Sequence, residues 1–320
     1  MSEFISIDWG TTSLRVSHCS DGGHTIIGSL ATHDGALAMN QRFLAKGNLS
    51  PEARRAFYQE VMSVAIGQLN ISSDQQLPVL MSGMVSATIG METLPYARLP
   101  FMLDGSKAVV KKWEIANQRF AMVSGLATED DLMRGEETQL VGAATIVDIG
   151  KDEALFIFPG THAKHVKIKR GEVEGFKTYM TGEVFCQMFS NSILAQSVAV
   201  HHDHNDRNTS SFLKGVVEGA EGNILQSMFR VRTAGMFNRM NKEENFSYLS
   251  GMLIGAELKD LIGSSSQPII LCGNGEMMQA YQEALKVLGI GKGQNDIFIV
   301  DSHQATAIGQ YKINELASHI

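Results

Sequence analysis

A pattern of strand, Gly-Thr turn and strand occurs twice in this chain, and it constrains the fold more than any other feature. The first copy spans Phe4–Leu30, with strands predicted over residues 4–8, 13–19 and 25–30 around Trp-Gly-Thr-Thr at 9–12. The second copy, near Glu153–Tyr179, keeps this order around Pro-Gly-Thr-His at 159–162. A Gly-Thr turn exposes backbone N–H groups and hydroxyls where no side chain blocks a polyphosphate. The repeat therefore predicts a nucleotide held between two related halves.

Length and composition favour two globular domains and exclude several classes of protein. The 320 residues exceed the usual size of one hydrophobic core, and 44% apolar with 19% charged residues is typical of globular proteins. No stretch approaches the roughly 20 apolar residues that span a bilayer, and the first residues lack the basic start of a signal peptide. We therefore expect a cytoplasmic protein with no membrane partner. A net charge of −7 argues against a nucleic-acid partner.

The cysteines and a histidine-rich run are not expected to bind metal. Cys19, Cys186 and Cys272 are odd in number, widely spaced and set in apolar surroundings, so they are predicted to be reduced thiols in the core. The run His201-His202-Asp203-His204 has metal-binding residue types. Contiguous residues of an extended loop point in opposing directions, however, so we expect a solvated loop.

Alternating helices and strands are predicted for the rest of the chain. Apolar spacing indicates helices over 52–69, 135–147, 183–200, 223–240, 247–262, 276–288 and 304–316, and strands over 77–81, 268–272 and 296–300. Gly251 and Gly255 predict close helix packing. The helix over 135–147 separates the two repeats. We therefore expect domains over 1–134 and 135–303, with the C-terminal helix at about 304–320 packing back on the first.

Charged residues beside the first Gly-Thr turn are candidates for phosphoryl chemistry. Asp8 ends a strand and is placed to hold Mg²⁺ through water, because that ion keeps much of its hydration and prefers carboxylate oxygens. Capping of a tight turn is the structural alternative. Arg15 lies one pleat beyond the turn and is either a stabiliser of phosphoryl charge or a solvated strand residue. The predicted phosphate-binding residues are Gly10, Thr11, Thr12, Arg15, Gly160 and Thr161.

An acidic cluster at residues 130–139 places four carboxylates and Arg134 at a predicted helix start. Acidic residues in a first helical turn are often there only because they are favourable toward the helix dipole. The functional interpretation is that Glu136 or a neighbour accepts the proton of an attacking hydroxyl while Arg134 holds an anionic substrate group. A phosphoryl-transfer enzyme needs such a base and positioned cations. The alternatives for the base are Asp131, Glu137 and Glu183.

Two further groups of residues are candidates for ligand binding. His162 and Lys164 follow the second turn and either bind phosphate or a substrate carboxylate or lie on the surface as solvated cations. Gly273-Asn274-Gly275 separates a buried strand from a helix, where bare backbone lies against an adenine or a ribose; a packing turn is the alternative. A dinucleotide-binding fold is excluded because no G-x-G-x-x-G follows the first strand.

These residues together carry a family resemblance. The two Gly-Thr units look like the phosphate-binding hairpins of the actin, hexokinase and heat-shock chaperone ATPase superfamily. Within it, the chain resembles the 2-dehydro-3-deoxygalactonokinases, also called 2-keto-3-deoxygalactonate kinases. The matching segments run in order along nearly the whole chain. They are Asp8–Arg15, Ser82–Val85, Met133–Gln139, Pro159–His162, Met180–Glu183 and Tyr248–Gly251.

The resemblance implies an α/β fold of two actin-like (ribonuclease H-like) domains, each with a mixed sheet flanked by helices. It implies ATP and Mg²⁺ in the cleft between them, and transfer of the γ-phosphate to the terminal (6-)hydroxyl of 2-dehydro-3-deoxy-D-galactonate in galactonate catabolism. In related sugar kinases the base follows a glycine before a connecting helix, and Gly135-Glu136 is the matching position. Glu136 is therefore the implied base, and Gly273–Gly275 the implied adenosine site.

Substrate contacts are implied for Gly83, Met84, Val85, Glu137, His162 and Lys164, and the sugar-acid carboxylate is expected to meet one of Arg98, Arg134, His162 or Lys164. The chain departs from the family at Ser86-Ala87 and Gly90-Met91, where Gly-Ser and Gly-Trp are frequent. It departs again at Ala163 and His165, where Ser and Trp are frequent. The alternatives are a kinase for another sugar or sugar acid, or a non-catalytic ATP-switched interaction protein. A homodimer is one expected assembly.

Overall fold

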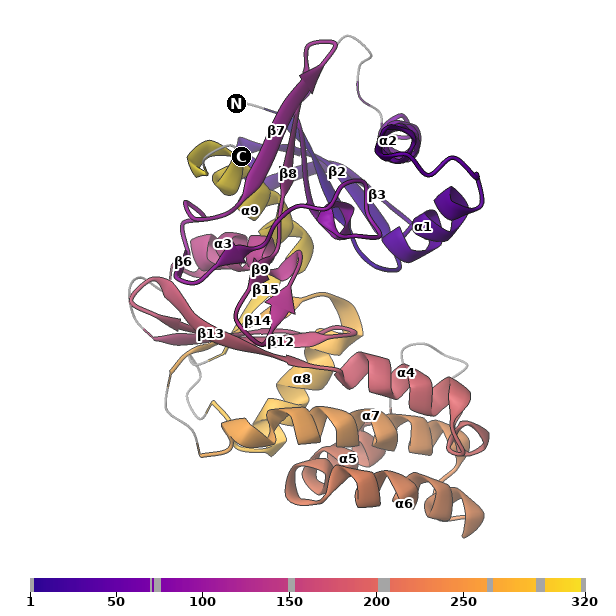
Figure 1. Cartoon of the computed structure of the whole chain (residues 1–320). Coiled ribbons are helices and arrows are strands. Elements are labelled where there is room, and N and C mark those ends of the chain that lie inside the picture. Colours follow the sequence, from indigo (N-terminus) through magenta and orange to yellow (C-terminus); the bar gives the residue numbers. More distant parts are fainter. Residues whose placement is uncertain are drawn as a thin grey trace. The chain divides into compact units, whose positions relative to one another are not determined.

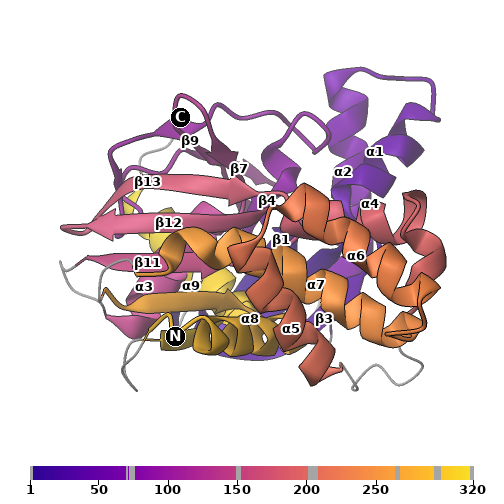
Figure 2. The same cartoon turned by 90° about the horizontal axis from the view of Figure 1, so that it is seen from below.

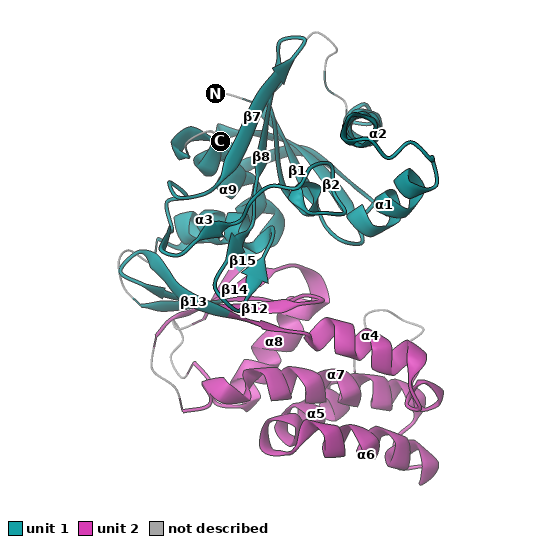
Figure 3. Cartoon of the chain, viewed as in Figure 1, with its two compact units in different colours: residues 1–156, 166–176, 300–320 teal, residues 157–165, 177–299 magenta. Residues whose placement is uncertain are grey.

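The structure is a computed structural model that describes residues 3–69, 71, 76–148, 153–200, 208–263, 267–291 and 297–317. The chain forms two compact units (Figure 3). Unit 1 comprises residues 1–156, 166–176 and 300–320, and unit 2 comprises residues 157–165 and 177–299. Within the described ranges, no helix is long and apolar enough to cross a membrane.

The first six-stranded sheet is built around the first repeat (Figure 1). Its order is β3-β2-β1-β4-β8-β7. β1 pairs with β2 in antiparallel fashion and with β4 in parallel fashion, so the carboxyl ends of β1 and β4 lie side by side. The strands are β1 (Phe4–Trp9), β2 (Leu14–Ser20), β3 (Thr25–Thr32), β4 (Val79–Gly83), β7 (Val110–Ile115) and β8 (Gln118–Val123).

Helices cover both faces of this sheet. α1 (Ala36–Leu44) and α2 (Pro51–Ile66) pack through Phe43 and Tyr58 on the face that carries Ile7 and Trp9. α9 (Ser302–Leu316) lies on the other face, where Gln310 Nε2 donates to Ile7 O at 2.8 Å and to Ser82 Oγ at 2.9 Å.

α3 (Glu136–Val147) packs against α9 at a contact that only glycine permits. A Cβ added to Gly142 would lie 1.8 Å from Ala305 O, and one added to Gly309 would lie 1.9 Å from Thr138 O. Any side chain at these positions would force the two helices apart.

The second six-stranded sheet repeats five strands of the first in the same order, and its sixth strand, β6, lies beside β13. Its order is β15-β14-β11-β12-β13-β6, so β11, β12, β13, β14 and β15 correspond in order to β1, β2, β3, β4 and β8. The predicted repeat and the predicted α/β fold, with two mixed sheets flanked by helices, are thus confirmed. The strands are β11 (Ala154–Phe158), β12 (Ala163–Lys169), β13 (Glu172–Tyr179), β14 (Ile269–Gly273), β15 (Ile297–Asp301) and β6 (Phe101–Met102).

Unit 2 also contains a helical layer organised around one central helix (Figure 2). α7 (Lys242–Leu258) contacts α4 (Thr181–Asn191), α5 (Thr209–Glu221), α6 (Ile224–Met236) and α8 (Gly275–Val287). α5 and α7 approach through glycines on both helices, which confirms the prediction from Gly251 and Gly255. Added Cβ atoms on these two residues would lie 2.0 Å from the carbonyl oxygens of Phe212 and Val216.

Several elements differ from the predicted ones. The helix predicted over 247–262 begins at Lys242, because Asn241 and Glu244 form a capping box ahead of it. The helix predicted over 183–200 is α4, which ends at Asn191. α1, α5, β7, β8 and the short strands β5 (Ala97–Arg98), β9 (Leu126–Ala127) and β10 (Leu132–Met133) were not predicted.

The cysteine prediction is wrong at one position. Cys19 and Cys272 are buried, and burial raises the pKa of the Cys19 thiol to about 12. Cys186 is exposed, because it lies on a helix with no buried side chain.

Candidate active site

In unit 1, the carboxyl ends of β1 and β4 bring Asp8 beside a bare stretch of backbone. Arg15 Nη1 donates to Asp8 Oδ2 at 3.1 Å, across the antiparallel pair of β1 and β2. Gly83 ends β4 with φ +86°, and an added Cβ would lie 2.6 Å from Trp9 O and 3.4 Å from Asp8 Oδ1. Glycine is required here both by the backbone conformation and by the closeness of β1.

The start of α3 lies against the same glycine. Gly135 has φ +111°, and its added Cβ would lie 3.4 Å from Gly83 Cα. Glu137 holds this turn: its Oε2 accepts from Gly135 N at 2.7 Å and its Oε1 from Thr138 Oγ1 at 2.9 Å. Burial, and then the charge of Glu136, raises the pKa of Glu137 to about 7. At 1% exposure Glu137 supports the turn from inside.

Arg134 and Glu136 project from this supported turn. Glu136 Oε2 accepts from Arg134 N at 3.1 Å. Arg134 Nη1 donates to both the carbonyl and the hydroxyl of Ser86 at 2.6 Å, and the guanidinium lies 4.2 Å from the centre of the Tyr96 ring. Its Nε is buried without a hydrogen-bond partner among the described residues. The arginine is therefore fixed in orientation by its neighbours, and its buried Nε–H is an unused donor among the described residues.

The first Gly-Thr turn leaves Thr11 and Thr12 exposed while its backbone is held from behind. The first residues of α1 donate to it: Ala36 N bonds Gly10 O at 3.0 Å and Leu37 N bonds Thr11 O at 3.1 Å. Gly35 allows this approach, since an added Cβ would lie 2.2 Å from the carbonyl carbon of Thr12. The turn is thus rigid and open on its outer side.

The second Gly-Thr turn, in unit 2, is held in the same way by α4. Glu183 N donates to Thr161 O at 3.0 Å, and an added Cβ on Gly182 would lie 2.7 Å from Gly160 O. His162 Nε2 is hydrogen-bonded to the Glu183 carboxylate on the surface. Lys164 is 4% exposed and donates to His162 O at 2.9 Å.

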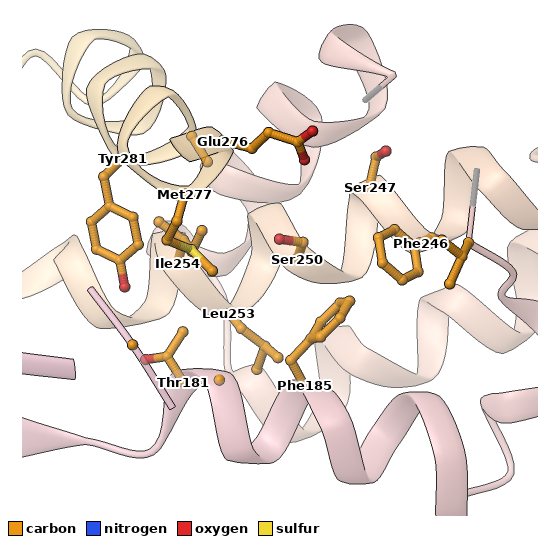
Figure 4. Close-up of a pocket in the computed structure, with 14 residues that line it drawn as sticks. Thr181, Phe185, Phe246, Ser247, Ser250, Leu253, Ile254, Glu276, Met277 and Tyr281 are labelled. Carbon is orange, nitrogen blue, oxygen red and sulfur yellow. The ribbon is translucent and has the colours of Figure 1, made fainter. Parts of the chain in front are cut away.

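A cavity of about 290 Å³ opens beside this second turn (Figure 4). Its walls come from α4, α7 and α8, and Phe185, Leu253 and Met277 supply much of the apolar surface. Gly160 borders it, as does Glu276 at the start of α8. The other polar side chains that line it are Thr181, Ser247, Ser250 and Tyr281. Mostly apolar walls with a few polar groups are typical of small-molecule sites.

Beneath this cavity lies a buried carboxylate that accepts three hydrogen bonds. Glu257 on α7 accepts from Thr181 Oγ1, from Tyr281 Oη at 2.7 Å and from His165 Nε2 at 2.8 Å. The side chains of Glu257 and His165 are 1% and 5% exposed. Burial, and then the charge of Glu257, raises the pKa of Tyr281 well above its ordinary value, so this phenol stays a donor.

Comparison with known proteins identifies the family. A model of the 2-keto-3-deoxy-galactonokinase family matches residues 8–313. The chain belongs to the 2-keto-3-deoxygalactonokinase family. The prediction drawn from the motifs is confirmed, and family membership makes the protein a phosphotransferase.

Individual members of the 2-keto-3-deoxygalactonokinase family match over nearly their full length. The probable 2-dehydro-3-deoxygalactonokinase DgoK1 of Rhizobium meliloti (strain 1021) is 31% identical over 315 residues, covering 96% of this chain and 94% of the relative. The 2-dehydro-3-deoxygalactonokinase of Escherichia coli (strain K12) is 27% identical over 298 residues, covering 90% and 91%. A crystal structure of a Sinorhizobium meliloti protein assigned to the 2-dehydro-3-deoxygalactonokinases superposes with a TM-score of 0.80 at 26% identity, covering 98% and 96%.

The predicted site residues of this kinase fall into two groups. Asp8, Gly83, Arg134 and Glu136 come together in unit 1. Unit 2 holds the second turn, His162, and the glycine turn before α8, where Asn274 precedes the helix and Gly275 begins it with φ +64°. The side chains of three residues expected at the substrate are buried. They are Val85, Glu137 and Lys164.

Several side chains around the site were not anticipated from the sequence. Ser86 and Tyr96 hold Arg134, and Glu257 supports the cavity. Thr181 lies within the Met180–Glu183 segment that matches the family, whereas Glu257 lies in a helical pattern that gives no signal of its role. His201–His204 lies outside the described residues. Among the residues that the structure describes, no group of three or more His, Cys, Asp or Glu side chains could hold a metal ion.

Proposed function

We propose that this protein transfers the γ-phosphate of ATP to the 6-hydroxyl of 2-dehydro-3-deoxy-D-galactonate, as part of galactonate catabolism. The observation that carries the proposal is the cluster in unit 1, where Asp8 and the turn from Arg134 to Glu137 meet at Gly83. This cluster combines a carboxylate, a fixed guanidinium and a candidate base, which are the groups that phosphoryl transfer requires. The family match supports the substrate class.

Glu136 is proposed as the general base. The bond from Arg134 N holds its carboxylate at the helix start, and Glu137 supports the same turn through Gly135 N. Glu136 is half-buried rather than enclosed. The substrate 6-hydroxyl oxygen forms a bond to the γ-phosphorus, the bond from that phosphorus to the bridging oxygen of ADP breaks, and the hydroxyl proton passes to Glu136.

Asp8 is proposed to hold Mg²⁺ through water. The fit rests on its chemistry: a single carboxylate, with 14% of its side chain exposed, at the open end of β1. Among the described residues, Asp8 belongs to no group of three or more His, Cys, Asp or Glu side chains that could hold a metal ion. This donor set suits a small cation that keeps most of its own water. When bound, such an ion would neutralise charge on the phosphates; Arg15 orients the Asp8 carboxylate.

The cavity of unit 2 is proposed to take the adenosine of ATP. Its apolar walls suit a flat aromatic base, and Gly160 of the second turn borders it, so phosphates leaving the cavity would meet bare backbone. Gly273, Asn274 and Gly275 precede Glu276, which lines the cavity. The carboxylate of the sugar acid is assigned to Arg98, an exposed guanidinium on β5 with one described bond, to Thr128 O.

The test is ADP release from ATP and Mg²⁺ with a panel of acceptors. The panel contains 2-dehydro-3-deoxygalactonate, its gluconate epimer, glucose, glycerol and N-acetylglucosamine. Turnover confined to the keto-deoxy acids is expected. Turnover on a neutral sugar, or slow hydrolysis with no acceptor preference, would overturn the assigned substrate while keeping the nucleotide site.

A further inference from the structure

We propose that Glu257 is a positioning residue that joins the cavity of unit 2 to the second Gly-Thr turn, and so sets the affinity for the nucleotide. The inference rests on the proposed function in one respect, that this cavity takes the nucleotide base. Glu257 itself does not line the cavity. It acts through the residues that do.

The contacts of Glu257 reach the cavity through two helices. Tyr281 on α8 and Thr181 at the start of α4 both line the cavity, and both donate their hydroxyls to the Glu257 carboxylate. Figure 4 shows these two hydroxyls on the same side of the cavity. A single buried carboxylate on α7 therefore fixes the separation of two other helices that form the walls.

The same contacts reach the second turn. Thr181 begins α4, and the first turn of this helix also holds the second Gly-Thr turn in place. Glu183 N donates to Thr161 O at 3.0 Å, and Gly182 lies close to Gly160. His165, on β12 directly after the turn, donates to the other oxygen of Glu257 at 2.8 Å. A shift of Glu257 would thus move the turn and both cavity walls together.

The surroundings of Glu257 make this geometry rigid. The His165 ring lies 4.6 Å from the ring of Tyr179, which closes the far side of the network. Burial, then Asp260 and Glu257, raises the pKa of Tyr179 above its ordinary value. Buried polar networks with every member bonded restrict side chains to one arrangement, and losing the central acceptor leaves several buried donors without partners.

The position that His165 occupies also makes a rescue experiment possible. In Glu257→Gln, the amide oxygen still accepts from Thr181 and Tyr281, and the amide NH₂ faces His165. A neutral imidazole accepts at Nε2 when its proton is on Nδ1, so glutamine can rebuild the network. In Glu257→Met, a side chain of similar size accepts nothing, and all three donors lose their partner.

A matched control exists elsewhere in unit 2. Glu218 on α5 also accepts from a tyrosine hydroxyl, that of Tyr248, and is bonded to Arg230 at 2.8 Å. Neither Glu218 nor Tyr248 lines the cavity. Glu218→Met removes the same kind of contact at a place that should not affect nucleotide binding.

The experiment is calorimetric titration of the full chain with ADP and Mg²⁺, together with thermal melts of each variant. We expect Glu257→Met to weaken ADP binding about tenfold, Glu257→Gln to remain within about threefold of the wild type, and Glu218→Met to bind as the wild type does. The KM for ATP should rise in Glu257→Met while kcat at saturating ATP changes by less than about threefold.

The outcomes separate the two proposals. A wild-type protein that binds no ADP would overturn the nucleotide site itself, and the role of Glu257 with it. ADP binding that is equally tight in Glu257→Met, or equally weakened in Glu218→Met, would overturn the positioning role alone. If Glu257→Met does not fold, Thr181→Val and Tyr281→Phe each remove one donor with little change of shape, and wild-type affinity in both would also overturn it.

Discussion

The two Gly-Thr turns share a backbone arrangement but differ in the chemistry around it. Each turn follows the first strand of a sheet with the same strand order, and each has its threonine carbonyl held by the N-terminus of a helix. Counting from the glycine of each turn, Asp8 corresponds to Phe158 and Arg15 corresponds to His165. An ion pair in the first turn is thus replaced by a buried ring and a histidine that bonds to Glu257.

This difference indicates that the two turns, although alike in backbone structure, have different functions. The first turn keeps a charged pair at an open strand end, which suits metal and phosphate charge. After the second turn, His165 directs its polar contact inward to Glu257, which supports a cavity. The scaffold sets where backbone is bare, and a few side chains per copy decide what each turn does.

Removing the Asp8 carboxylate should produce the largest effect on kcat, and it tests the proposed difference between the two turns most directly. We expect Asp8→Asn to lower kcat about 10³-fold with the fold intact, because the charge that would hold the metal is lost. Phe158→Leu is the matched change in the second turn; as a large-to-small change at a buried site it should cost about 2 kcal/mol of stability, with little effect on kcat. Steady-state kinetics and thermal melts measure both. A normal rate in Asp8→Asn would rule out the metal role.

Glu137 in unit 1 and Glu257 in unit 2 are both buried near the proposed sites. The burial of Glu137 can be tested through the pH dependence of stability. Its folded-state pKa, about 7, is raised from about 4.5, so between these pH values the folded protein keeps a proton that the unfolded chain releases. The free energy of unfolding therefore falls as pH rises through this window, by about 3 kcal/mol, and is flat above it.

Glu137→Gln removes this titration, so the stability of the wild type relative to the variant should decline by that amount from pH 4.5 to pH 7. Urea denaturation at several pH values measures it. Glu60→Gln, at a site on α2 that is 71% exposed, is the control and should show no such slope difference. Parallel stability curves for wild type and Glu137→Gln would contradict the burial argument.

The assignment of the general base can also be tested by comparing the two units. Each has a candidate glutamate in the first turn of a helix, Glu136 on α3 and Glu183 on α4. We expect Glu136→Gln to slow phosphoryl transfer about 10²-fold while the Kd for ADP stays unchanged. Glu183→Gln, the candidate in unit 2, should change single-turnover rates little, because its carboxylate is paired with His162. The reverse result would move the base to Glu183, and unchanged turnover in both would move it to Asp131 or Glu137.

The smallest expected effect concerns the clamp for the substrate carboxylate. Arg98→Gln should raise the KM for the sugar acid about tenfold with kcat nearly unchanged, because the contact is made equally in the ground state and the transition state. His162→Gln is the corresponding change beside the second turn and should leave this KM unaltered. If His162→Gln raises the KM and Arg98→Gln does not, the clamp belongs to the second turn.

Much of the fold was predictable from local signals, and the supporting contacts of the site were not. Apolar periodicity and glycine turns mark strands and helices directly, and the repeat around Gly10 and Gly160 predicted two related sheets. Those signals act over a few residues. The bond from Glu257 to His165 joins residues 92 positions apart, and that from Arg134 to Ser86 joins residues 48 apart, so no local pattern contains them.

Polar composition also concealed the first turn of α7 and the whole of β7. α7 begins with Lys-Glu-Glu-Asn, and only the tertiary structure buries Asn245 and Ser247 on that helix. β7 carries two lysines, and it belongs to the sheet because β8 pairs with it. Tertiary contacts here overrode the weak preferences that sequence reasoning uses.

The return of α9 to unit 1 has a consequence for how the protein is made. Gln310 bonds the backbone at Ile7, 303 positions earlier, and Gly309 packs on α3. A ribosome releases the chain from its N-terminus, so β1 and β4 emerge long before the helix that covers one face of their sheet. All of unit 2 is synthesised in the interval. Unit 1 therefore emerges first but is completed last, because the sheet that contains β1 and β4 is covered by α9 only when translation ends.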